Sequence, residues 1–132
     1  MFASKLLNLA EQQGQKEKQA LIKLAIFFYQ IDKHFREGEQ KYFDQWLRSL
    51  SWESGVSVVS FQSQCIAESA KAIDSNDDEV IKAFLVEVVA EIDDEVLKKT
   101  AVNLALDVVI ADREYSDIEN KWVEKLRLIL KV

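Results

Sequence analysis

The chain has 132 residues, of which 48% are hydrophobic and 30% are charged, and its net charge is −6. This length and composition are typical of a globular protein of one domain, here expected over residues 1–132, and they exclude a disordered chain. Because residues 51–132 carry 17 Asp/Glu against 9 Lys/Arg, binding to a phosphate backbone is unfavourable, and no nucleic-acid partner is expected.

Cysteine usage and hydropathy both favour a cytoplasmic protein. Cys65 is the single cysteine and cannot form an internal disulfide, which is typical of a reducing compartment. The longest uninterrupted apolar run, residues 24–29, is far too short to cross a bilayer, so no transmembrane segment is expected. No secretory signal is recognisable.

The spacing of apolar residues predicts an all-α fold with about seven helices. The chain has no proline and three glycines, so it lacks the turn residues that a series of strands requires. Apolar side chains instead recur three and four positions apart. A cluster of Asp, Ser and Asn at residues 74–77 indicates a helix end followed by a helix start. The predicted helices cover about residues 2–12, 16–33, 38–51, 57–73, 77–91, 94–112 and 117–131.

An internal repeat is visible when the sequence is shifted by 80 residues. Residues 1–50 then align with residues 81–130 without a gap, and ten positions are identical. Roughly three or four identities are expected by chance. The repeat predicts two three-helix units joined by a connecting helix at residues 57–73.

The best-matched part of the repeat is a helix–loop–helix motif. The first copy runs from Asp32 to Glu39 and the second from Asp112 to Glu119. Both copies fit the pattern Asp-x-x-aromatic-x-x-x-Glu, so the two acidic residues lie seven positions apart in each.

With Ala111, Asp112 and Glu119, the second copy resembles the tellurite-resistance TerB-like family. This family includes the amino-terminal domain of DjlA-type J-domain co-chaperones, and its members show Ala-Asp-Gly-x-Ile-x-x-x-Glu in one or both halves of a duplicated helical domain. The departures here are Lys33 and Arg113 at the glycine position and Phe35 and Tyr115 at the aliphatic position. The His-Pro-Asp signature of J-domains is absent, so co-chaperone activity of that kind does not carry over.

The resemblance implies a non-catalytic protein-binding module in a stress or tellurite-resistance system, acting through a protein partner. It also implies an alternative function, because some family members are thought to bind divalent metal through acidic clusters. In this chain the corresponding oxygen ligands are Asp112, Glu114, Asp117 and Glu119, and the cofactor would be a divalent cation. The sequence does not identify the partner, the metal, the oligomeric state or the pathway.

The same acidic residues also have a structural interpretation. Ser116 and Glu119 have the spacing of a capping box, in which each side chain bonds the backbone amide of the other. Asp112 ends the preceding helix, and its carboxylate can accept hydrogen bonds from the free amides that open the next helix. Asp32 and Glu39 can act in the same way in the first copy. These residues then connect two helices of a hairpin without any ligand.

A standard EF-hand is excluded. If Asp112 is the first ligand, the sixth position is Asp117 instead of glycine and the twelfth is Val123 instead of glutamate. A looser oxygen site stays open as the alternative.

Nothing in the sequence favours an enzyme. His34 is the single histidine and lies among charged residues, which is typical of an exposed side chain. Cys65 is expected to be a small core residue. One cysteine and one histidine do not support a zinc site.

Alanine variants distinguish the structural from the metal interpretation, and we favour the structural one. It predicts that Asp112→Ala costs about 1.5–3 kcal/mol and Glu119→Ala about 0.5–1.5 kcal/mol of unfolding free energy, with or without divalent ion. Asp32→Ala and Glu39→Ala should cause comparable losses. The metal interpretation predicts that only the second copy responds, and only when ion is present. Without ion, removing a crowded carboxylate relieves repulsion and should leave the stability unchanged or slightly higher. Thermal melts with chelator and with divalent ion decide between them.

Overall fold

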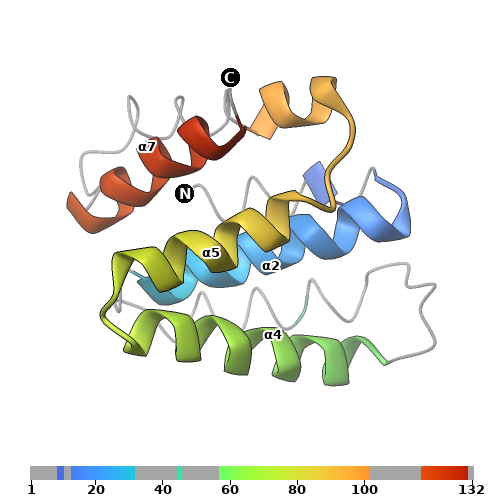
Figure 1. The fold of residues 1–132 in the computed structure, drawn as a ribbon. Coiled ribbons are helices and arrows are strands. Elements are labelled where there is room, and N and C mark those ends of the chain that lie inside the picture. Colours follow the sequence, from blue (N-terminus) through green and yellow to red (C-terminus); the bar gives the residue numbers. More distant parts are fainter. Residues whose placement is uncertain (1–8, 11–12, 32–44, 46–56, 102–116, 131–132) are drawn as a thin grey trace.

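The computed structural model describes residues 9–10, 13–31, 45, 57–101 and 117–130. These residues form α2 (Gln15–Ile31), α4 (Val58–Asp74), α5 (Asp78–Val89), α7 (Asp117–Leu130) and a further helical segment at residues 95–101, as Figure 1 shows. No strand occurs within these ranges, which confirms the all-α class predicted from the sequence.

Four predicted helices agree with observed ones to within a few residues, namely 16–33, 57–73, 77–91 and 117–131. The main difference is at the end of α5, which stops at Val89. The amides of Glu91 and Ile92 donate to carbonyls three residues back, at 3.3 and 2.9 Å, so the chain tightens into a turn instead of continuing the helix. The predicted helices 2–12 and 38–51 and most of 94–112 lie outside the described residues, so a total of seven helices stays a prediction.

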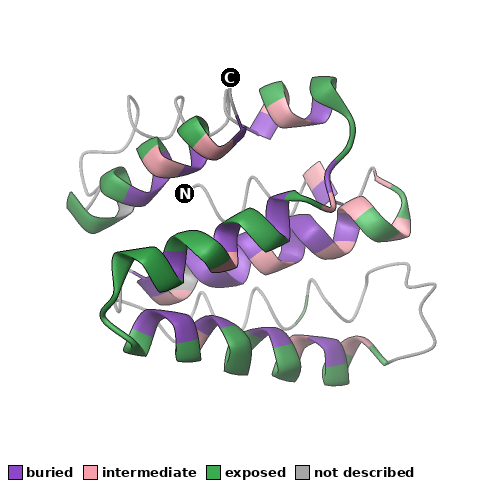
Figure 2. Ribbon diagram, viewed as in Figure 1, coloured by how far each residue is buried: buried purple, intermediate pink, exposed green. Residues whose placement is uncertain are grey.

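Helix α2 lies at the centre of the structure and is surrounded on several sides. Its residues 20–22 and 24–28 are at most 3% exposed, and Ile31 is also buried. Consecutive buried positions point in several directions around a helix, so α2 is apolar on more than one face. The helices α4, α5 and α7 all pack against it, α4 most extensively. Figure 2 shows this burial on α2 and the exposed outer faces of α4 and α5.

A short turn joins α4 to α5 at the residues where the sequence predicts a helix end and start. The Ser75 hydroxyl donates to the Ala72 carbonyl at 2.6 Å, and Asn76 takes a left-handed conformation with φ 53°. Asn tolerates this conformation better than most residues. The Asp77 carboxylate then accepts from the Glu79 amide at 3.0 Å and caps α5. The two helices run antiparallel and lie side by side (Figure 1).

The described residues do not test the predicted duplication. Residues 37–50, which should be equivalent to α7, lie outside them apart from Gln45. The counterparts of α5 in the first copy, residues 1–9, are described only at residue 9. The repeat of residues 1–50 in 81–130 therefore stays a prediction.

Ser69 places an unsatisfied hydroxyl in the core. It lies on α4 and is completely buried, and its Oγ has no hydrogen-bond partner among the residues that the structure describes. Burying a hydroxyl without a partner costs about 1–3 kcal/mol. This cost opposes the stabilisation that α4 gains by packing on α2.

We expect Ser69→Ala to raise the free energy of unfolding by about 1–3 kcal/mol, because it removes this hydroxyl and leaves an alanine in a helix. Urea unfolding followed by far-UV circular dichroism measures the change. Ser63→Ala is the matched control, since Ser63 is an exposed residue of the same helix and its replacement should gain about 0.5 kcal/mol or less. Equal effects at the two positions would show that the buried hydroxyl is not destabilising.

Candidate functional site

The structure describes only part of the acidic motif. Asp117 is the first residue of α7 and is exposed, and Glu119 follows in the first turn of that helix. The other predicted members, Asp32, Glu39, Asp112, Glu114 and Ser116, lie outside the described residues. Both the hairpin contact and the looser oxygen site therefore stay predictions. Within the described ranges, no three His, Cys, Asp or Glu side chains form a group that could hold a metal ion.

Cys65 is a core residue, as the sequence predicts. It is 3% exposed on α4, and burial raises the pKa of its thiol to about 12. A thiol with a pKa raised this far is protonated at neutral pH, and it is a poor nucleophile because the thiolate is the reactive form. His34 lies outside the described residues.

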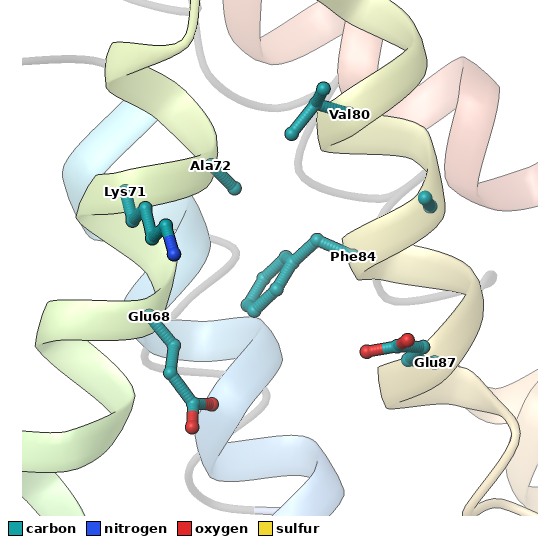
Figure 3. Close-up of a pocket in the computed structure, with 7 residues that line it drawn as sticks. Glu68, Lys71, Ala72, Val80, Phe84 and Glu87 are labelled. Carbon is teal, nitrogen blue, oxygen red and sulfur yellow. The ribbon is translucent and has the colours of Figure 1, made fainter.

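A groove between α4 and α5 is a concave feature of the described surface. It has a volume of about 250 Å³. Its lining, which defines the α4–α5 groove, consists of Glu68, Lys71, Ala72, Val80, Ala83, Phe84 and Glu87. Figure 3 shows the Phe84 ring pointing from α5 into the space between the helices, with Lys71 and Glu68 on the opposite wall. The floor is apolar and the rim is charged.

The antiparallel arrangement of the helices gives the groove two different ends. Ala72 and Val80 lie toward the α4–α5 turn, whereas Glu68 and Glu87 lie toward the other end, on opposite walls (Figure 3). Gln64 donates to the Glu68 carboxylate at 3.1 Å. Neither Glu68 nor Glu87 forms an ion pair with a lysine or arginine in the described part of the chain. The groove lining is therefore apolar toward the turn and carries both glutamates toward the other end, while Asp74 and residues 77–79 add negative charge at the turn itself.

Phe84 connects the groove to the core. Its ring centroid lies 6.1 Å from that of Phe27 on α2, and Phe27 lies 6.1 Å from Trp122 on α7 in an edge-to-face arrangement. Such aromatic pairs contribute about 0.5–1.5 kcal/mol beyond their buried area. The wall of the groove is thus part of a packed aromatic cluster.

Negative charge is concentrated on the two helices that form the groove. Residues 57–92 contain seven Asp/Glu and two Lys, a net charge of −5 out of −6 for the whole chain. By contrast, α2 contains three Lys and one Glu, and the charges of α7 cancel. The groove therefore lies in the most acidic part of the molecule.

Sequence reasoning did not find this site. The apolar character of α5 on two faces is visible in the sequence, since Val80, Ala83 and Phe84 accompany the buried Ile81 and Leu85. Apolar residues on two faces of one helix indicate a second contact surface. Spacing alone does not say which face packs on the core.

The chain matches no protein-family model, no curated protein and no solved structure. Each helix within the described ranges is too short or too polar to span a membrane.

A surface ion pair links α5, one wall of the groove, to α7. Lys121 Nζ lies 2.7 Å from Asp78 Oδ2, and Lys125 Nζ lies 3.9 Å from the same oxygen. Both lysines also lie over the Trp122 ring, at 5.4 and 5.0 Å from its centroid. The hydrogen bond from Lys121 and the positive charges of both lysines lower the pKa of Asp78.

The lowered pKa of Asp78 makes this contact sensitive to acid. Because the folded state favours the ionised carboxylate, the contact stabilises the fold above the ordinary pKa of aspartate and is lost as the pH falls through the lowered value. We expect Lys121→Gln to raise the pKa of Asp78 towards its ordinary value. Lys125→Gln is the control and should raise it less, because its nitrogen is farther away. An NMR titration of the Asp78 carboxyl measures its pKa in both variants. Equal changes in the two variants would contradict the larger role given to Lys121.

Proposed function

We propose that the chain is a non-catalytic, TerB-like protein-binding module whose acidic α4–α5 face recognises a cationic protein partner. The observation that carries this proposal is the net charge of −5 on residues 57–92, the segment that also forms the apolar groove. Complementary charge speeds encounter and selects the partner, and an apolar centre supplies affinity. The place of the module in a stress or tellurite-resistance system is proposed from the TerB-like motif alone.

The chemistry of the described residues supports a binding role over catalysis. Cys65 is buried and protonated, and the groove is lined by apolar side chains, two glutamates and one lysine. The volume of about 250 Å³ is also below the roughly 300–1,000 Å³ of typical small-molecule sites. A protein surface that inserts a side chain fits this space better than a substrate.

Charge neutralisation tests the proposal. A helical peptide of about 18 residues, rich in Lys and Ala, serves as a cationic probe, and calorimetry measures its affinity for the intact chain. Replacing both rim carboxylates, as Glu68→Gln with Glu87→Gln, should cost about 1 kcal/mol, or roughly fivefold in affinity. The loss should shrink as salt concentration rises, because these carboxylates are exposed to solvent.

Glu95→Gln with Glu124→Gln is the matched control. Both residues are exposed and lie outside residues 57–92, and replacing them removes the same amount of charge. The control should retain the affinity of the unmodified chain. If both double variants weaken binding equally, the probe responds to overall charge and the α4–α5 face is not the recognition surface.

A further inference from the structure

We propose that the α4–α5 groove binds one large apolar side chain of a basic amphipathic helix. In this arrangement the side chain packs beside Phe84, and a Lys or Arg of the same helix contacts Glu68 and Glu87. The inference rests on the proposed function and names the site and the type of ligand. It follows from the size of the groove, the asymmetry of its ends and its charge.

The size of the groove fits a single anchoring residue. A space of about 250 Å³ has room for one large side chain, and aromatic side chains contribute the most apolar contact area at interfaces. Residues of this kind, inserted into a pocket near the centre of an interface, carry much of the binding energy of protein complexes. Phe84 supplies the apolar contact surface, and its own packing on Phe27 restrains it.

The two ends of the groove set the spacing required in the ligand. Along α5, Phe84 and Glu87 are three residues apart and lie on one face of the helix. A ligand helix lying along the groove therefore needs its basic residue about three or four positions from its apolar anchor. This pattern is that of an amphipathic helix with a cationic flank.

Charge argues against a second copy of this chain as the occupant. Two acidic hairpins, each with a net charge of −5, would repel each other if they met face to face. Anionic lipid surfaces are disfavoured for the same reason. A cationic segment is the occupant that complements the surface.

Three synthetic helical peptides test the proposal against the intact chain. The first is rich in Lys and Ala and carries one central Trp, with a Lys four positions away. The second has Gln in place of that Trp, and the third keeps the Trp but has Glu in place of every Lys. We expect the first peptide to bind at least about tenfold more tightly than either of the others. On addition of the first peptide, the backbone NMR signals that shift should belong to residues of α4 and α5.

A variant that fills the groove provides the structural control. Ala83→Gln places a polar side chain in the groove at an exposed helical position, so the fold should be retained. It should remove the advantage of the Trp peptide over its Gln version. Ala67→Gln is the matched substitution, because Ala67 is an exposed alanine of α4 outside the groove, and it should leave the advantage unchanged.

The possible failures are distinguishable. If the Trp and Gln versions of the Lys peptide bind equally, the anchor site is wrong while the acidic recognition surface stands. If the Glu peptide binds as tightly as the Lys peptide, recognition of a cationic partner is wrong while the apolar site stands. If no peptide binds, both are overturned. If Ala83→Gln instead abolishes a dimer seen by sedimentation, the occupant is a second copy and the inference is overturned.

Discussion

The structure depends on the burial of α2 on more than one face. Residues 24–28 are five consecutive side chains with almost no exposure, and a single packing partner cannot cover them all. Helices α4, α5 and α7 must therefore surround α2, and each uses one apolar face to do so. The groove exists because α4 and α5 meet over α2 and leave their outer faces towards solvent, where Phe84 is only partly covered.

Ion pairs on the perimeter explain where the unbalanced charge lies. Lys16 and Lys23 of α2 pair with Asp93 and Glu91, at 3.1 and 3.6 Å, near the end of α5. Lys121 of α7 pairs with Asp78 at its start. The lysines of the neighbouring helices thus balance acidic residues on the inner edges of the hairpin. The other acidic residues of the hairpin lie at the turn, as Asp74, Asp77 and Glu79, and along the groove, as Glu68 and Glu87.

Much of the fold could be predicted from the sequence, whereas the site could not. Apolar spacing predicted α2, α4, α5 and α7, and the Asp, Ser and Asn residues at 74–77 predicted the turn, because these signals are local. The groove depends on which of two apolar faces of α5 packs on α2, and that choice is set by contacts between distant segments. Val80 and Ala83 therefore looked like ordinary helix residues. The acidic motif at residues 112–119 lies mostly outside the described residues, so its role is still a prediction.

The turn between α4 and α5 has a consequence for the energetics of recognition. Only three residues separate the helices, and the N-cap residue Asp77 and the left-handed Asn76 fix their path. The separation of the two walls is therefore set before any ligand arrives. A preorganised surface of this kind loses little conformational entropy on association, so more of the contact energy is expressed as affinity. Lengthening this turn would loosen the walls and weaken complex formation even if every side chain in the groove were kept.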